Sequence, residues 1–167
     1  MRNIELKASL PSLADATITC ATIEAHFEQD IHQIDTYFVV ANGRLKLREC
    51  SPGNCELIHY HRADVADTKA SEYSIVVVDP SIKEQLSEAL GQLIVVDKVR
   101  ALWLWENVRI HLDTVEGLGT FIEFEAVLSD EYDDADGHQK LGWLQEQFNI
   151  RPEHVIDVSY SDLMLVK

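Results

Sequence analysis

The 167-residue sequence has few cysteines and no long apolar run, and these absences exclude several classes of protein. The three cysteines, Cys20, Cys50 and Cys55, are an odd number and a poor basis for a disulfide framework, which favours a reducing compartment. No run of about eighteen apolar residues occurs, and the first residues alternate in polarity, which argues against a membrane helix or an export signal. We therefore expect a cytoplasmic protein with no membrane partner.

Positive charge is scarce, because 14 lysines and arginines stand against 29 aspartates and glutamates and give a formal net charge of −15. This balance argues against nucleic acid or an anionic membrane as a non-specific partner, since both require a net basic surface. The few cations are nevertheless concentrated in segments that are typical of β-strands. Eight of the 14 are of this kind: Lys7, Arg44, Lys46, Arg48, Arg62, Lys98, Arg100 and Arg109.

Glycine-rich phosphate loops are also missing. The sequence has seven glycines but no GxxxxGK or GxGxxG pattern. The short run EGLG at 116–119 is too small a signal to indicate a nucleotide site by itself. A phosphate site formed by charged strand side chains needs no such loop.

The length and the 46% hydrophobic composition suit one domain, which we expect to span residues 1–167. Polar and apolar residues alternate in several segments, which predicts strands, and capping residues predict helices between them. The expected strands are 3–9, 33–40, 44–50, 55–62, 71–79, 93–105, 107–115 and 119–128. The expected helices are 12–26, 81–90 and 136–148, with a last helical turn near 159–166. The fold class is then α+β.

Two short turns predict antiparallel hairpins. Asn42 and Gly43 are the residue types that supply both positive φ angles of a type I′ turn. The residues SPGN at 51–54 are typical of a second turn. We therefore expect consecutive strands to pair with one another.

Each strand carries its charges on one face, because residues two apart point to the same side. Lys46 and Arg48 lie opposite Leu47, and Glu123 and Glu125 lie opposite Phe124. A polar face turned to water is the simple explanation. However, the cations gather on the strands while the carboxylates are largely confined to the first and last of them. This distribution favours a cupped sheet whose charged faces line a shared enclosed cavity.

Charges in an enclosed cavity must be compensated, and a polyphosphate with a metal ion would do so. Arginine offers forked donors to phosphate oxygens, and lysine offers a compact point charge. Carboxylates hold hard cations such as Mg²⁺ or Mn²⁺. The pattern therefore indicates a site for a small anionic ligand and a divalent metal.

These motifs resemble the CYTH, or triphosphate tunnel, family over nearly the whole chain and in the family's order. The resemblance is carried by NIELKA, QIDTYF with NGRLKLRE, LIHYHR, VDKVR, VRIHLDTVEGLGTFIEFE and the tail YSDLM. It implies an antiparallel eight-stranded barrel with helices packed outside. It also implies a metal-dependent reaction on a triphosphate.

The resemblance assigns roles to the charged residues. Glu5, Glu123 and Glu125 correspond to metal carboxylates, with Asp113 as a further participant. The phosphate-holding set comprises Lys7, Lys46, Arg48, Arg62, Lys98, Arg100 and Arg109, and the residues expected to act in catalysis are Lys98, Arg100 and Asp113. One departure stands out, because Asn3 occupies the place of the family's first motif glutamate and should weaken metal binding.

Other residues allow competing interpretations. A zinc site would use Cys50, Cys55, His59 and His61, but their spacing matches no common four-ligand pattern, and ordinary strand residues are favoured. His111 is a candidate general acid or a hydrogen-bonded wall residue. Trp103 and Trp105 are candidates to stack a base, although packing beneath a helix is favoured.

The expected function is that of a class IV adenylyl cyclase, which converts ATP to cyclic AMP and pyrophosphate with Mg²⁺ or Mn²⁺. A triphosphatase would use the same charges with water as the nucleophile. A non-catalytic polyphosphate- or nucleotide-binding module is the alternative from a different class, motivated by Asn3. The partner in each case is a small triphosphate, and the sequence leaves a homodimer open.

Overall fold

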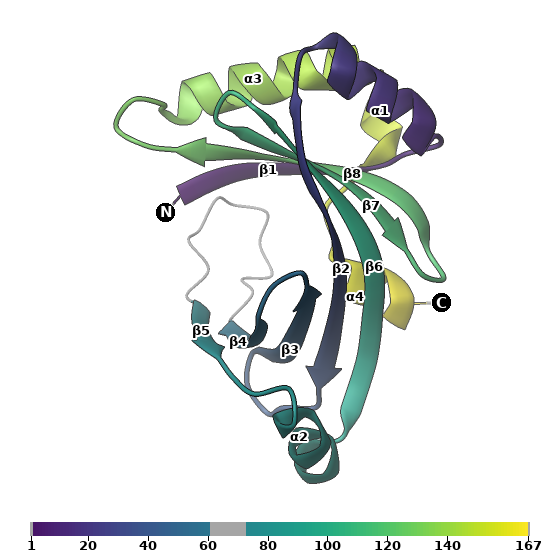
Figure 1. The fold of residues 1–167 in the computed structure, drawn as a ribbon, viewed down its shortest axis with the longest axis vertical. Helices are drawn as coiled ribbons and strands as arrows, with labels where there is room; N and C mark the ends of the chain where they lie inside the picture. The colour runs from purple at the N-terminus through teal and green to yellow at the C-terminus, as the bar shows by residue number, and fades with distance from the viewer. Residues whose placement is uncertain (1, 61–72, 167) are drawn as a thin grey trace. The chain divides into compact units, whose positions relative to one another are not determined.

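The computed structural model describes residues 2–60 and 73–166, which form two compact units. Unit 1 comprises Met1–Asp30, Val99–Val115 and Gly119–Val158, and unit 2 comprises Ile31–Lys98, Glu116–Leu118 and Ser159–Lys167. The elements are β1 (Arg2–Ser9), α1 (Leu13–Thr22), β2 (His26–Phe38), β3 (Arg44–Ser51), β4 (Cys55–Tyr60), β5 (Tyr73–Val77), α2 (Ile82–Leu90), β6 (Gln92–Trp105), β7 (Val108–Val115), β8 (Gly119–Leu128), α3 (Asp134–Gln147), a 3₁₀ turn (Pro152–His154), β9 (Val155–Ile156) and α4 (Tyr160–Leu165) (Figure 1).

The α+β class with an antiparallel sheet is as predicted. The hydrogen-bonded strand order is β5-β4-β3-β2-β6-β7-β8-β1-β9. The ninth strand, the two-residue β9, was not expected from the sequence. The order has free ends at β5 and β9, so the pairing among the described residues does not itself close a barrel.

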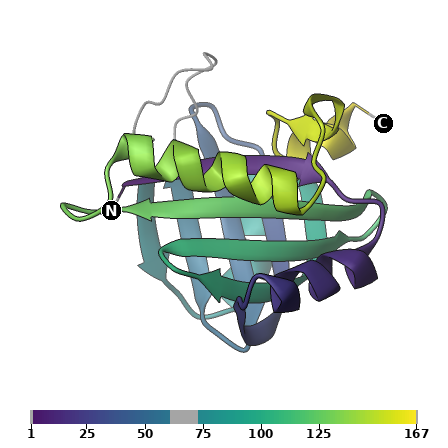
Figure 2. The ribbon, with the colours of Figure 1, turned by 90° about the horizontal axis from the view of Figure 1, so that it is seen from above.

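Unit 1 buries the apolar face of its strands under two helices. Ile110, Ile122 and Phe124 are fully buried, as the alternation along β7 and β8 predicts. Helices α1 and α3 lie across this face of the sheet (Figure 2). Because the apolar side faces the helices, the charged side of the same strands faces the other way.

The helices of unit 1 begin at side-chain caps. Ser12 accepts a hydrogen bond from the Asp15 amide at the start of α1, and Asp133 forms a capping box with Asp136 at the start of α3. α1 ends at Thr22, four residues before the predicted end, because the chain turns at Glu24, whose φ is 59°.

The two tryptophans of β6 pack as favoured from the sequence. Trp105 stacks on Trp143 of α3 with ring centroids 4.8 Å apart, and Trp103 makes an edge contact with Phe27 at 5.2 Å. Both rings also border the apolar core of unit 1. Their position supports packing rather than base stacking.

Unit 2 has its own apolar core against α2. Leu47 and Phe38 are buried, and Ile82 and Leu86 of α2 pack against the same cluster. Asp79 accepts a hydrogen bond from the Ser81 amide just before the helix, whose N-cap residue is Ser81 rather than Asp79. As in unit 1, a helix covers the apolar side of the strands and leaves the charged side to other contacts.

The predicted type I′ turn at Asn42 and Gly43 is wrong. β2 and β3 pair as expected, but Phe38 is opposite Leu45, so the connection is longer than two residues. A type I′ turn needs a positive φ at both of its central residues. Of Asn42 and Gly43, only Gly43 has a positive φ, which is 68°. The hairpin prediction was correct, whereas the turn type was not, because the last residues of the apolar run leave the sheet.

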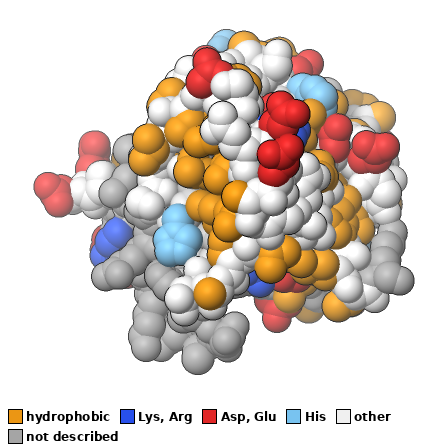
Figure 3. Space-filling model, turned by 90° about the horizontal axis from the view of Figure 1, so that it is seen from below, with side chains coloured by type: hydrophobic (Ala, Val, Ile, Leu, Met, Phe, Trp, Pro, Cys, Tyr) orange, Lys and Arg blue, Asp and Glu red, His pale blue; other side chains and the backbone are white. Residues whose placement is uncertain are grey.

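The face around α2 is largely apolar and acidic. Figure 3 shows hydrophobic side chains gathered there among scattered carboxylates. Exposed hydrophobic residues of unit 2 include Val76, Val77, Leu90 and Leu93.

No helix in the described part of the chain is long and apolar enough to cross a membrane. All three cysteines are free thiols.

Candidate functional site

The charged face of unit 1 is a grid set by strand register. Glu5 of β1 is opposite Glu125 of β8, which in turn is opposite Arg109 of β7. One step along the same face, Lys7 is opposite Glu123, which is opposite His111. The sequence pattern placed these residues on one face of each strand, and the register brings the faces together. We call this group, with Asn3, Arg100 and Asp113, the acidic cluster.

Cations and an amide lie among the carboxylates of the acidic cluster. Lys7 Nζ is 3.4 Å from Glu123 Oε2, and Arg109 Nη1 is 3.3 Å from Glu125 Oε2. Asn3 Nδ2 donates to Glu5 Oε1 at 2.8 Å and to Glu125 Oε1 at 2.7 Å. The three glutamates are therefore already engaged by neighbouring donors.

Arg100 is held by a fully buried carboxylate. Its Nε and Nη2 donate to the two oxygens of Asp113, both at 2.7 Å, and Asp113 has no exposed surface. Such a bidentate pair fixes the plane of the guanidinium. Arg100 Nη2 is also 3.6 Å from Glu123 Oε1. Asp113 therefore lies beneath the arginine that the sequence assigned to phosphate.

His111 has the hydrogen bond that the wall-residue interpretation requires. Its Nδ1 is 3.2 Å from Glu123 Oε1. Burial lowers the pKa of His111, and the nearby Arg100 charge lowers it further, against the opposing effect of Glu123. Burial acts to raise the pKa of Glu123, but the His111 hydrogen bond and the charges of Arg100 and Lys7 bring it well below its usual range. A neutral His111 then donates from Nδ1 to an ionised Glu123.

The donor chemistry of the acidic cluster fits a hard divalent cation. Crowding by protein atoms raises the pKa of Glu5, and the charges of Glu123 and Glu125 raise it further, although part of the residue is exposed. A cation beside these carboxylates would relieve that repulsion. However, within residues 2–60 and 73–166 no three such side chains converge closely enough to form a ready-made metal centre. The carboxylates must move to hold one.

Unit 2 has a second charged group, the basic cluster, around Asp35. Lys46 Nζ donates to Asp35 Oδ2 at 2.8 Å, and Arg48 donates to both oxygens of Asp35 at 2.9 Å. Burial acts to raise the pKa of Asp35, but the Arg48 hydrogen bonds and the Lys46 charge hold it well below its usual range. The Lys46 ammonium also lies 5.4 Å from the centre of the Tyr37 ring. Asp35 thus fixes two predicted phosphate ligands.

The carboxyl-terminal helix α4 adds to the basic cluster. The Lys98 ammonium lies 5.1 Å from the centre of the Tyr160 ring, and Tyr37 is hydrogen-bonded to Ser161. Arg44 Nη2 donates to Asp162 Oδ1 at 2.7 Å. The basic cluster therefore comprises Asp35, Tyr37, Arg44, Lys46, Arg48, Lys98 and the start of α4.

Four of the predicted residues have little exposed surface. Lys46 is 9% exposed and Lys98 is 6% exposed, and the side chains of Arg100 and Glu123 are each 14% exposed. None of these four side chains projects into bulk solvent. A cavity shared by all of them stays a prediction, and Arg62 lies outside the described residues.

Asp35 is the residue that the sequence analysis missed. It occurs in the QIDTYF run, which read as an aromatic and β-branched strand. One signal could have found it: a lone carboxylate two residues from Tyr37 on a strand that pairs with Lys46 and Arg48. A buried aspartate facing two cations is a typical positioning residue.

Comparison with known proteins agrees with this geometry. The sequence profile of the CYTH domain matches residues 1–160, which include most of both units. The chain belongs to the CYTH family. The match covers the acidic cluster completely and the basic cluster as far as Tyr160.

Several relatives resemble this CYTH protein. A protein of Methanocaldococcus jannaschii named "Putative adenylate cyclase" is 25% identical over 146 residues, covering 84% of this chain and 83% of its own. The PH1012 protein of Pyrococcus horikoshii superposes with a TM-score of 0.81 at 22% identity, covering 96% and 98% of the two chains. A Hippeastrum protein, described as a "putative adenylyl cyclase" with a dominant triphosphatase activity, gives 0.71 at 18% identity over 99% and 96%. The structural matches establish the fold.

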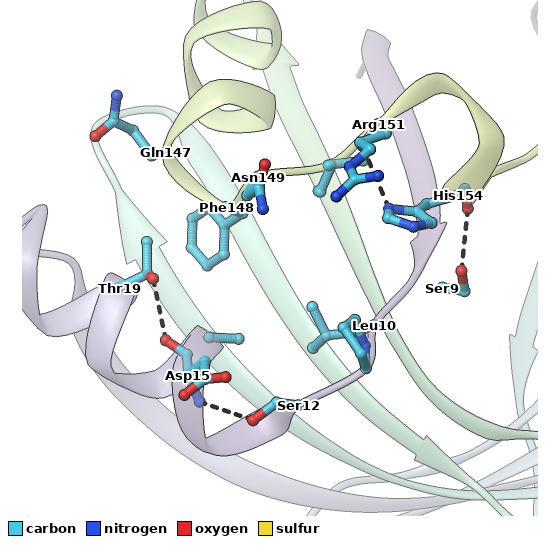
Figure 4. A pocket seen from close by; sticks show the side chains of 13 residues that line it. Ser9, Leu10, Ser12, Asp15, Thr19, Gln147, Phe148, Asn149, Arg151 and His154 are labelled. Carbon is cyan, nitrogen blue, oxygen red and sulfur yellow. Dashed lines mark hydrogen bonds between the residues drawn. The ribbon is translucent and has the colours of Figure 1, made fainter.

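One surface cavity of the CYTH protein lies apart from its predicted residues. A cavity of about 410 Å³ lies in unit 1 between the start of α1 and the end of α3, and Figure 4 shows the side chains that line it. Phe148 and Leu10 line its apolar part, and Arg151 and His154 line one rim. None of the residues assigned to metal or phosphate borders it.

The zinc interpretation finds no support in the part of the chain that the structure describes. No metal-binding group of histidine, cysteine or carboxylate side chains occurs there. His59 Nε2 lies 3.1 Å from the Asn42 carbonyl oxygen, and Cys55 is buried in the core of unit 2. His61 lies outside the described residues.

Proposed function

We propose that this CYTH protein is a metal-dependent enzyme that acts on a triphosphate and converts ATP to cyclic AMP and pyrophosphate. The observation that carries the proposal is the set of solvent-withdrawn cations held by buried aspartates. Lys46 is fixed by Asp35, and Arg100 by Asp113, through contacts within the protein. Positively charged groups fixed in advance bind polyanions without a large ordering cost.

The predicted phosphate-binding cations would hold the phosphate oxygens of the triphosphate. Arginine forks suit pairs of oxygens, and lysines supply point charges. In the cyclase reaction the ribose 3′-oxygen bonds to the α-phosphorus, the bond to the pyrophosphate oxygen breaks, and the hydroxyl proton is released. The cations would stabilise the charge that develops on the pyrophosphate. The set is Lys7, Lys46, Arg48, Lys98, Arg100 and Arg109, with Arg62 retained from the sequence.

The glutamates of the acidic cluster would hold Mg²⁺ or Mn²⁺. Glu5, Glu123 and Glu125 supply hard oxygen ligands of the kind these ions take. When bound, the ion would neutralise charge on the phosphates. Asp113 has a different part in this proposal, since it is fully buried and acts through Arg100 as a positioning residue.

Hydrolysis is the second candidate reaction. The related Hippeastrum fold is described with a dominant triphosphatase activity, and the same cations would serve water as the nucleophile. A water oxygen would bond to the terminal phosphorus, and the bond to the bridging oxygen would break. The third candidate, binding without turnover, is favoured by Asn3 in place of a motif glutamate.

Product analysis separates these reactions. The purified protein is incubated with Mg²⁺ or Mn²⁺ and either ATP or inorganic triphosphate. Cyclic AMP with pyrophosphate supports the cyclase, orthophosphate supports the triphosphatase, and binding without product supports the module. No binding of either triphosphate would reject all three.

Variants test the assigned cations. Lys98→Ala and Arg100→Ala should each weaken triphosphate binding by about 1.5–3 kcal/mol, because a charge-assisted contact is lost. Arg2→Ala is the control, since the Arg2 side chain is 73% exposed in a surface ion pair. Equal affinities for all three variants and the wild type would contradict the assignment.

A further inference from the structure

The carboxamide of Asn3 joins two carboxylates on neighbouring strands. Its Nδ2 donates to Glu5 at 2.8 Å and to Glu125 at 2.7 Å. A primary amide nitrogen has two hydrogens, so both are used in this bridge. One neutral side chain therefore satisfies two negatively charged groups at once.

The bridge lies where electrostatic repulsion is expected. Glu5 and Glu125 are register partners on β1 and β8, and like charges directly opposite one another destabilise a sheet. Arg109 contacts Glu125 from the other side, and its closest nitrogen is 3.3 Å away. Glu5 accepts a hydrogen bond from Asn3, and the charge of Lys7 also acts on it. The amide takes the place of a positive charge between the two glutamates.

We propose that Asn3 is a positioning residue that substitutes for the divalent cation in the metal-free protein, so that a cation must displace its two hydrogen bonds. This inference rests on the proposed function, because it assumes that Glu5 and Glu125 hold the metal. The amide and the cation then compete for the same two carboxylates. A glutamate at this position would instead add charge and attract the cation.

This competition makes metal binding weak on its own. The site has one negative charge fewer than it would have with a glutamate at position 3, and cation affinity rises with the number of charged ligands. A metal-bound triphosphate brings further oxygens and would compensate for the lost hydrogen bonds. Metal and triphosphate should therefore bind with positive cooperativity.

Calorimetric titration of Mn²⁺ into the nucleotide-free protein tests the inference. Asn3→Ala should bind Mn²⁺ roughly threefold to tenfold more tightly, because no amide hydrogen bonds remain to be broken. The same variant should lower the midpoint of thermal unfolding of the metal-free protein by about 2–4 °C. Asn3→Glu should bind Mn²⁺ at least about tenfold more tightly. Asn54→Ala, at an exposed turn asparagine, should match the wild type.

Weaker, unchanged or absent Mn²⁺ binding by Asn3→Ala would overturn the inference. Weaker Mn²⁺ binding by Asn3→Ala would mean that the Asn3 carbonyl is a metal ligand. Unchanged Mn²⁺ affinity, or no Mn²⁺ binding by any variant, would remove the competition. Triphosphate turnover by the wild type alongside such a result would leave the proposed function standing. Tighter Mn²⁺ binding by Asn3→Ala without any triphosphate binding would instead reject the proposed function alone.

Discussion

The acidic cluster of unit 1 and the basic cluster of unit 2 share one feature, an arginine fixed by a buried aspartate, but differ in the charges around it. In each cluster, a buried aspartate accepts two hydrogen bonds from an arginine. The donor–acceptor distances are 2.7 Å from Arg100 to Asp113 and 2.9 Å from Arg48 to Asp35. In each cluster, the aspartate and the arginine lie on neighbouring strands, on the charged face of the sheet. The common element is thus a fixed guanidinium.

The clusters differ in what surrounds that pair. The acidic cluster sets three cations, Lys7, Arg100 and Arg109, against four carboxylates, Glu5, Asp113, Glu123 and Glu125. The basic cluster sets four cations, Arg44, Lys46, Arg48 and Lys98, against two carboxylates, Asp35 and Asp162. An anion-rich group suits a metal ion, and a cation-rich group suits phosphate. Variants in each cluster can test this difference between the two groups.

The largest effect is expected at Asp113. Asp113→Asn removes the carboxylate charge that accepts two hydrogen bonds from Arg100, whose side chain is 14% exposed. Removing one member of a buried pair costs about 3–5 kcal/mol. Urea denaturation should therefore show a loss of this size in the free energy of unfolding.

Asp134→Asn is the matched control for that measurement. Asp134 also accepts two hydrogen bonds from one arginine, Arg2, at 3.0 Å, but both side chains are more than half exposed. This substitution should cost only about 0–1 kcal/mol. Equal losses for the two variants would show that burial does not give the Asp113 pair its strength.

Asp35 should give a smaller loss that depends on pH. Its pKa is lower in the folded protein, so the ionised group stabilises the fold above a pH of about 4, and this contribution declines as the pH falls toward the folded value. At pH 7, Asp35→Asn should cost on the order of 2–3 kcal/mol, because Arg48 is partly exposed. Denaturation of both proteins between pH 7 and pH 3 should show the gap narrowing. A gap that stays constant with pH would contradict the ionised role of Asp35.

Much of the charged face could be predicted from alternation alone. Glu123 and Glu125 alternate with Ile122, Phe124 and Ala126, and the three apolar residues are fully buried, as that pattern requires. A period of two residues is a local property, so one strand reveals its own faces. The same logic located Lys46 and Arg48 opposite Leu47.

Partners across strands were harder to predict, because they depend on register. Asp35 meets Arg48 only because β2 and β3 pair with that particular offset. Alternation along β2 shows that Asp35 shares a face with Tyr37, but not which cation lies opposite. The length of the 39–43 connection sets that offset, and the expected two-residue turn was wrong.

Long-range contacts of the tail were likewise beyond a local pattern. The helical turn near 159–166 was expected, and α4 confirms it. Its contacts with Tyr37, Arg44 and Lys98, more than sixty positions earlier in the chain, come from tertiary packing. A capped helix can be recognised locally, whereas the surface that it packs on cannot.

The smallest effect is expected at the contact between Arg44 and α4. Arg44 donates to Asp162 at 2.7 Å, and Asp162 also accepts from the Ser159 amide at the start of the helix. Because both charged side chains are partly exposed, Arg44→Met should cost only about 0.5–1 kcal/mol of global stability. Loss of this contact should instead open α4 locally, so amide hydrogen exchange at residues 160–165 should speed up while exchange in β7 stays unchanged.

Arg151→Met is the control for this contact. Arg151 pairs with Glu153 at 3.6 Å through side chains that are more than half exposed, and it lies in unit 1. It should leave exchange in α4 as it is in the wild type. If Arg44→Met also leaves α4 unchanged, the ion pair between Arg44 and Asp162 does not hold α4 in place. The contact between Lys98 and Tyr160 would then be independent of that ion pair.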